Sequence, residues 1–140
     1  MKQKLVIVGN GMAPGRALDL LFETAPEAYE VTIFNAEPRV NYDRIMLSPV
    51  LSGEKSFEEI VIHGDGWYIK HGVTLYKGAK VTGIDRAAKS VTAEFSPSAT
   101  RLARREPTIT VPYDRLIIAT GSNAIARIHY PGDASVPTHF

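Results

Sequence analysis

Two glycine-containing turns hold the residues of this sequence best suited to binding a ligand. Gly9, Gly11 and Pro14 follow the apolar run Leu5–Val8 and open a segment with helical periodicity. In a strand–turn–helix unit, Gly9 permits a tight turn, and Gly11 lets a pyrophosphate approach the backbone at the helix N-terminus. Pro14 replaces the third glycine of the usual fingerprint, and Gly15 comes one residue late. The placement between a predicted strand and a predicted helix favours dinucleotide binding over a purely structural turn.

The second turn, Ala119–Ser122, follows another apolar run, Leu116–Ile118. If both runs form buried parallel strands of one sheet, both turns line the same crevice. Glu37 lies just past a third predicted strand, 29–34. A carboxylate at that strand end can accept hydrogen bonds from both ribose hydroxyls and would repel a 2′-phosphate. The alternative is an exposed loop glutamate.

Other side chains give weaker indications of a site. Considered alone, Arg44 suits a bidentate contact with phosphate or carboxylate, but a solvated surface arginine is the commoner case. Trp67 and Tyr68 could stack on a ligand ring, although we expect them to be core residues beneath an antiparallel insert. Arg101, Arg104 and Arg105 are expected to lie on a solvated loop rather than to bind an acidic partner.

Composition excludes several kinds of site. The chain has 140 residues, 44% hydrophobic and 22% charged, with a net charge of +1 and no cysteine. Disulfides, thiolate metal sites, iron–sulfur ligation and a redox-active cysteine pair are therefore excluded within it. The four histidines have no metal-ligand spacing, so no metal site is expected: His63, His71, His129 and His139. No segment resembles a signal peptide or reaches membrane-spanning length, which predicts a cytoplasmic protein without a membrane partner. No nucleic-acid partner is expected either, although the net charge of +1 argues neither for nor against one.

The predicted elements begin with a β-α-β unit that positions the first turn and Glu37. Its strands are expected at 5–8 and 29–34, with a helix at 14–23 between them. Short helices are expected near 42–47 and 67–70. Alternating runs then predict antiparallel strands at 73–76, 80–85, 89–94 and 108–111.

The remaining segments complete a single predicted domain over residues 1–140. Residues 96–107 are predicted to form a polar surface loop, 116–119 a third buried strand, and 123–140 an irregular tail. The fold class is therefore α/β, a Rossmann-like parallel sheet with an antiparallel β-meander crossover in the place where a helical crossover is usual.

Three segments, 5–13, 34–38 and 41–54, resemble the N-terminus of the large subunit of assimilatory NAD(P)H-dependent nitrite reductase. That family belongs to the pyridine-nucleotide-disulfide-oxidoreductase-like flavoproteins, together with rubredoxin and ferredoxin reductases. The resemblance covers roughly residues 3–95 and 111–122, and the segment 41–54 is its most specific part. Rubredoxin and ferredoxin reductases usually carry a lysine where this chain has Pro49, which favours the nitrite reductases.

The resemblance implies FAD as the cofactor and assigns a role to individual residues. Glu37 would hold the adenosine ribose, Arg44 would lie against the FAD, and Val81 would contact adenine through its backbone. The first turn would bind the pyrophosphate through Gly9, Gly11, Met12, Ala13 and Pro14. The second turn would lie beside the cofactor through Ala119, Thr120 and Gly121.

The resemblance also implies a larger parent enzyme. There, FAD takes a hydride from NAD(P)H, and electrons pass through an iron–sulfur cluster to siroheme, where nitrite becomes ammonia in nitrate assimilation. We expect this chain to be a truncated FAD-binding portion that is inactive alone and acts with the remaining domains; its oligomeric state is left open. The alternatives are a non-catalytic nucleotide-binding or assembly module and a fragment of a rubredoxin or ferredoxin reductase-like flavoprotein.

Overall fold

A computed structural model describes residues 2–97, 106–121, 125–126 and 138–139 of the chain. The loop arginines Arg101, Arg104 and Arg105, together with Ser122 and His129, lie outside the described residues. Two short strands, β10 (Ile125–Ala126) and β11 (Thr138–His139), pair antiparallel within the segment that the sequence predicted to be irregular.

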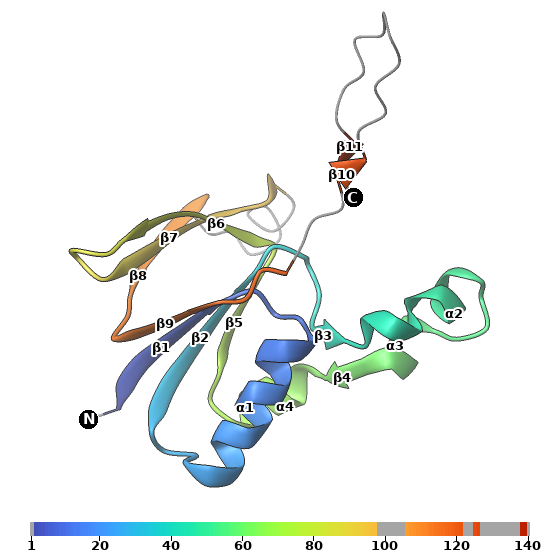
Figure 1. Ribbon diagram of the computed structural model, residues 1–140, viewed down its shortest axis with the longest axis horizontal. Helices are drawn as coiled ribbons and strands as arrows, with labels where there is room; N and C mark the ends of the chain where they lie inside the picture. Colours follow the sequence, from blue (N-terminus) through green and yellow to red (C-terminus); the bar gives the residue numbers. More distant parts are fainter. Residues whose placement is uncertain (1, 98–105, 122–124, 127–137, 140) are drawn as a thin grey trace, which may run out of the picture.

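A four-stranded parallel sheet forms the centre of the fold, in the order β5-β2-β1-β9 (Figure 1). Its strands are β1 (Gln3–Val8), β2 (Tyr29–Asn35), β5 (Thr74–Lys77) and β9 (Arg115–Ile118). The helix α1 (Met12–Thr24) connects β1 to β2. The strand order reverses at β1, because β2 lies on one side of it and β9 on the other. Ligands of open α/β sheets bind at such a switch point, beyond the carboxyl ends of the strands.

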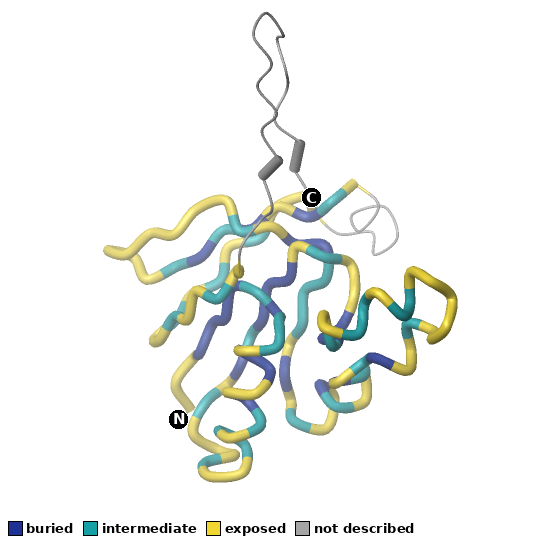
Figure 2. Tube along the Cα trace, turned by 45° about the vertical axis from the view of Figure 1, so that its right-hand side comes forward, coloured by how far each residue is buried: buried dark blue, intermediate teal, exposed yellow. Residues whose placement is uncertain are grey.

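Alternation along β1 explains why both faces of the sheet are covered. Leu5 and Ile7 point into a core shared with α1 and the helix α4 (Asp65–Lys70), whereas Val6 points into a second core on the opposite face. An antiparallel sheet covers that second face (Figure 1). Figure 2 shows the buried segments concentrated in the central strands. The predicted buried strand at Leu5–Val8 is confirmed.

The antiparallel sheet is the predicted β-meander. It contains β6 (Ala79–Asp85), β7 (Ser90–Phe95) and β8 (Thr108–Pro112) in that order. A register shift between Val81 and Gly83 marks a bulge in β6. The chain enters this sheet after β5 and returns to the parallel sheet as β9, so the predicted crossover type is confirmed.

The residues between β2 and α4 in the sequence form a separate arm that extends away from the parallel sheet (Figure 1). Its strands β3 (Asn41–Tyr42) and β4 (Val61–His63) pair antiparallel. Between them lie a 3-10 helix η1 (Arg44–Met46) and two short helices, α2 (Leu47–Leu51) and α3 (Phe57–Ile60). The short helix predicted near 42–47 therefore begins later and continues further than expected.

Three expectations about these elements are wrong. Residues 74–77 form β5, which pairs parallel with β2 rather than antiparallel, since an alternating pattern does not specify the direction of the partner. The strand β9 is not buried: Ile117 is 40% and Ile118 63% exposed, because β9 lies at the edge of the sheet. Trp67 and Tyr68 belong to the core on the α1 face, not beneath the antiparallel sheet.

Candidate functional site

The two predicted glycine turns touch at the carboxyl ends of β1 and β9. Gly9 has a φ of +107°, and a Cβ built on it would lie 2.2 Å from the carbonyl oxygen of Ala119. The Ala119 N–H donates to the Val8 carbonyl at 2.8 Å, and the Gly9 N–H donates to the Phe34 carbonyl at 2.8 Å. A side chain at Gly9 would therefore collide with the second turn, which adds a packing reason to the turn geometry predicted for this glycine.

Gly11 lies in different surroundings. Its φ is −81°, which any residue adopts, and no described atom lies within 4 Å of the Cβ position built on it. Nothing in the described chain itself requires glycine there. Open space beside the backbone is what an approaching phosphate group needs, as predicted for this position.

The N-terminus of α1 is open to an anion. Gly11 is the N-cap residue, and in the described part of the chain no side chain caps the helix. The first turn, Met12–Gly15, contains no acidic residue, and Pro14 has no N–H to satisfy. The N–H groups at this end carry the positive pole of the helix dipole, so the predicted first-turn residues Met12, Ala13 and Pro14 surround a favourable position for negative charge.

The buried Asn41 supports this turn from beneath. Its side chain is 0% exposed, and its Nδ2 donates to the carbonyls of Asn10 at 3.0 Å and Gly11 at 2.6 Å. Its Oδ1 has no hydrogen-bond partner among the described residues, which costs about 1–3 kcal/mol for a buried polar atom. The sequence predicted no role for Asn41, because nothing local shows that β3 passes under the first turn.

Glu37, the predicted ribose ligand, lies in a cluster of donors after β2. Arg44 forms an ion pair with its Oε1, Tyr42 donates from its hydroxyl to Oε2 at 3.0 Å, and Arg39 Nε lies 3.9 Å from Oε2. The Glu37 side chain remains 33% exposed. Two guanidinium groups therefore surround this carboxylate, and they oppose the repulsion of a 2′-phosphate that Glu37 alone would exert.

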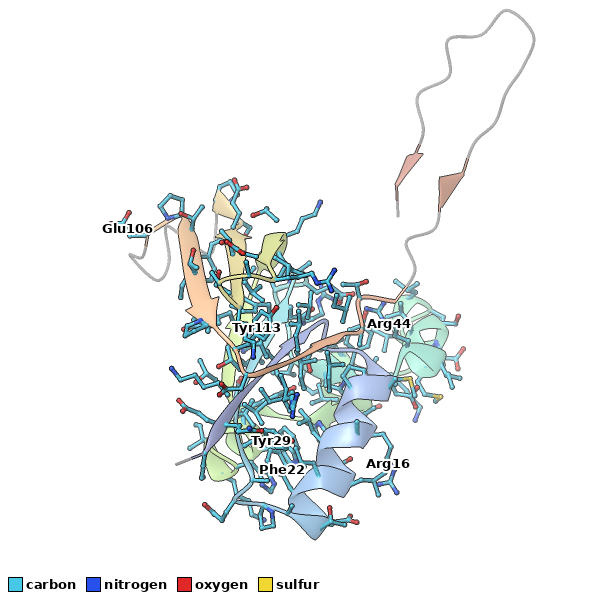
Figure 3. All side chains as sticks on the ribbon, turned by 60° about the vertical axis from the view of Figure 1, so that its left-hand side comes forward. Arg16, Phe22, Tyr29, Arg44, Glu106 and Tyr113 are labelled. Carbon is cyan, nitrogen blue, oxygen red and sulfur yellow. The ribbon has the colours of Figure 1, made fainter. Side chains whose placement is uncertain are left out.

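Aromatic rings hold these arginines in place. The Arg44 guanidinium lies 5.1 Å from the Tyr42 ring centre, and that of Arg39 lies 5.4 Å from the Phe57 ring centre. Burial, and then the hydrogen bond to Glu37, raise the pKa of Tyr42, so its hydroxyl remains a donor. The hydrogen bond to Glu37 raises the pKa of Arg44. Figure 3 shows Arg44 at the opposite end of the parallel sheet from Phe22 and Tyr29.

The remaining predicted residues lie near the carboxyl ends of the same parallel strands. Ala119, Thr120 and Gly121 form the turn after β9, and Gly121 has a φ of +72°. Val81 lies at the bulge of β6, partly buried against the second core. The Gly78 N–H, directly before β6, donates to the Glu37 carbonyl at 3.0 Å, which ties the start of β6 to the loop after β2.

His63 contacts α1 and α4 and has a structural role there. Its Nε2 lies 2.9 Å from Asp19 Oδ1 on α1, and its ring stacks on Trp67 with 3.7 Å between centroids. No group of three metal-ligating side chains occurs among the described residues. No helix of the described ranges is long and apolar enough to cross a membrane.

Comparison with known proteins agrees with this geometry. The sequence matches the pyridine nucleotide-disulphide oxidoreductase family over residues 3–139. In Bacillus subtilis, the assimilatory nitrate reductase electron transfer subunit is 41% identical over 87% of this chain, and a nitrite reductase [NAD(P)H] is 39% identical over 86%. The nitrite reductase (NADH) large subunit of Escherichia coli is 38% identical over 86%. The chain spans 13–14% of the length of these relatives.

Solved structures show the same fold. The NADH:rubredoxin oxidoreductase of Clostridium acetobutylicum superposes with a TM-score of 0.70 at 25% identity, over 96% of this chain and 32% of its own. Putidaredoxin reductase, in complex with putidaredoxin, gives 0.73 at 21% identity, over 94% and 28%. The predicted resemblance and fold class are thus confirmed, and the chain belongs to the pyridine nucleotide-disulphide oxidoreductase family of flavoproteins.

Proposed function

We propose that this chain binds FAD at the carboxyl ends of β1, β2 and β9 in the parallel sheet. The observation that carries the proposal is the uncapped N-terminus of α1 beside Gly11, where a Cβ would meet nothing within 4 Å. That arrangement fits the pyrophosphate of a dinucleotide, because it offers backbone N–H donors and room for close approach.

The residues around these strand ends fit the other parts of the cofactor. Glu37, just past the end of β2, would accept hydrogen bonds from the adenosine ribose, and Arg44, which is ion-paired with it, would meet the phosphates. Val81 would contact adenine through its backbone, and Thr120, within the second turn, would lie beside the cofactor. When bound, FAD would supply the redox chemistry, in which a hydride is taken up and electrons are released one at a time.

For the parent protein, we propose NAD(P)H-dependent reduction of nitrite to ammonia in nitrate assimilation. The support is the 38–39% identity to nitrite reductases over most of this chain. Siroheme and an iron–sulfur cluster would be held by the remaining domains, since these 140 residues contain no cysteine. The proposal includes a cytoplasmic location and partners limited to FAD and those domains.

A second candidate is electron transfer to a nitrate reductase, favoured by the 41% identity to the Bacillus subtilis electron transfer subunit. The two candidates differ in their electron acceptor, which an assay of this chain joined to the remaining domains can identify. Nitrite-dependent oxidation of NAD(P)H supports the first candidate, and nitrate reduction with an added reductase subunit supports the second. A rubredoxin reductase-like flavoprotein, at 27% identity, has less support.

Titration of the purified 140-residue chain tests the cofactor proposal. We expect binding of FAD and ADP, and we expect Gly11→Val to abolish it while the circular dichroism spectrum stays native, because the space beside Gly11 would be filled. Unchanged affinity in that variant would show that the phosphates bind elsewhere. A colourless protein that binds ADP but not FAD would instead favour a non-catalytic nucleotide-binding module.

Activity of the isolated chain is a separate test. Hydride transfer needs a nicotinamide held against the flavin, and these residues contain one dinucleotide fingerprint. With FAD, NADH and nitrite, we expect no ammonium above the free-flavin background. Turnover above that background would contradict the assignment of this chain as a cofactor-binding portion of a larger enzyme.

A further inference from the structure

We propose that Asn41 is a positioning residue for the phosphate-binding turn, which orients the N–H groups of Gly11 and Met12 toward the ligand. The inference rests on the proposed function, because it concerns how the same turn is held in its binding geometry. It concerns a residue from β3, outside the β1–turn–α1 unit whose glycines were predicted from the sequence.

The hydrogen bonds of Asn41 fix two consecutive peptide planes. Its Nδ2 donates to the carbonyls of Asn10 and Gly11, and the Gly11 carbonyl also accepts the Gly15 N–H at 3.2 Å within α1. In a planar trans peptide, the carbonyl and the following N–H point in opposite directions. Because the two carbonyls face Asn41, the N–H groups of Gly11 and Met12 face away from it, toward the open side of the turn.

The surroundings of Asn41 are built to hold this side chain. A Cβ on Gly15 would lie 3.0 Å from Asn41 Nδ2, so Gly15 leaves the space that the amide occupies. The Tyr68 hydroxyl accepts hydrogen bonds from the Asn41 backbone N–H at 3.3 Å and from Asn10 Nδ2 at 3.0 Å. One buried tyrosine from α4 therefore fixes both Asn41 and the turn that it supports.

The unpaired Oδ1 of Asn41 shows which function of the amide is used. Both of its hydrogen bonds come from the Nδ2 donor, while Oδ1 is buried with no partner in the described chain. Reversing the amide would place Oδ1 against two carbonyl oxygens, so this orientation is the favourable one. A donor is therefore what this position supplies, and the isosteric Asn41→Asp change removes it and places an acceptor against the two carbonyls.

The test compares ADP with adenosine as ligands of wild type and Asn41→Asp by calorimetric titration. Only ADP carries the phosphates that the turn would bind, so we expect the ratio of ADP to adenosine affinity to fall at least tenfold. A structural defect alone would lower both affinities together. The negative charge of Asp would also repel the phosphates of ADP, so the uncharged Tyr68→Phe variant separates positioning from repulsion. The matched control is Val91→Ala, which truncates a fully buried side chain in the second core and should leave the ratio unchanged.

Tyr68→Phe provides a second and milder variant, since it removes only the hydroxyl that holds Asn41 and Asn10. We expect a fall of the same ratio in the same direction, by roughly threefold, corresponding to about 0.65 kcal/mol. If Asn41→Asp does not fold, Tyr68→Phe decides the question. An unchanged ratio in a folded variant of either kind would overturn the proposal.

Amide resonances separate this proposal from the proposed function. In the ligand-free protein, Tyr68→Phe or Asn41→Asp should shift the Gly11 and Met12 amide signals, while Val91→Ala should not. A wild-type protein that shows no preference for ADP over adenosine would contradict phosphate binding at the turn itself. Unmoved Gly11 and Met12 signals in the variants would contradict the positioning role, whatever the wild type binds.

Discussion

Gly9 and Gly11 are two residues apart, yet the structure predicts a large loss of stability for Gly→Ala at Gly9 and almost none at Gly11. At Gly9, a Cβ would lie 2.2 Å from the Ala119 carbonyl oxygen and 2.6 Å from its carbonyl carbon. A carbon–oxygen contact normally lies at about 3.3 Å or more, so the second turn would have to move by about 1 Å. We therefore expect Gly9→Ala to separate the ends of β1 and β9.

The magnitude follows from two terms. An L-residue at a φ of +107° costs about 1–3 kcal/mol. Displacing Ala119 also weakens its hydrogen bond to Val8, a further cost of about 1 kcal/mol. With the remaining overlap, we expect the free energy of unfolding to fall by about 3–5 kcal/mol, a large part of the 5–15 kcal/mol typical of a domain.

Urea unfolding followed by circular dichroism measures this change, and Gly11→Ala is the matched control. Gly11 has an ordinary φ of −81° and no described atom near the added Cβ, so its stability should change by less than about 0.5 kcal/mol. A loss below about 1 kcal/mol for Gly9→Ala, or equal losses in both variants, would refute the contact between the two turns.

Three further predictions concern side chains around the site. Glu37→Gln should weaken ADP binding by about 1–2 kcal/mol. It should also raise the affinity for 2′-phospho-ADP relative to ADP, because the guanidinium groups beside Glu37 lose their counter-charge. Titration with both ligands checks this, and a wild-type preference for the 2′-phosphate would contradict the ribose role. His63→Ala should lower the free energy of unfolding by about 2–3 kcal/mol, since it removes a partly buried hydrogen bond to Asp19 and a ring stacked on Trp67. Urea unfolding measures this loss, and a change under about 0.5 kcal/mol would contradict it. Burial raises the pKa of Tyr68, so the folded state binds more protons than the unfolded state above pH about 10, and stability should fall as pH rises through that range. Tyr68→Phe should reduce this loss of stability at alkaline pH. An unchanged pH dependence of thermal unfolding in the variant would show that the raised pKa of Tyr68 is not its cause.

Much of the fold was predictable because its signals are local. The continuous apolar run Leu5–Val8 indicates a strand covered on both faces, and the residues after Pro14 have the periodicity of α1. The β-branched and aromatic residues of 29–34 indicate β2 in the same way. The glycine turn was predictable for the same reason, since Gly9 and Gly11 directly follow the strand and precede the helix.

The pairing of β5 was not predictable from its residues. Side chains alternate between the two faces in parallel and antiparallel strands alike, so the sequence of Thr74–Lys77 does not specify whether it pairs parallel or antiparallel. The exposure of β9 depends likewise on its place at the sheet edge and not on its apolar sequence, Leu116–Ile118. Both features depend on which elements are neighbours after folding.

The candidate site divides in the same way. The sequence alone determined the first turn, its glycines and the acidic residue after β2, because each is specified by residue type and by its distance from a strand. Only the tertiary structure decided that Gly9 faces Ala119, that Asn41 lies beneath Gly11, and that His63 pairs with Asp19. These contacts join segments 30 or more residues apart, and such pairings arise from the packing of the arm and the second turn against the β-α-β unit, which no local pattern encodes.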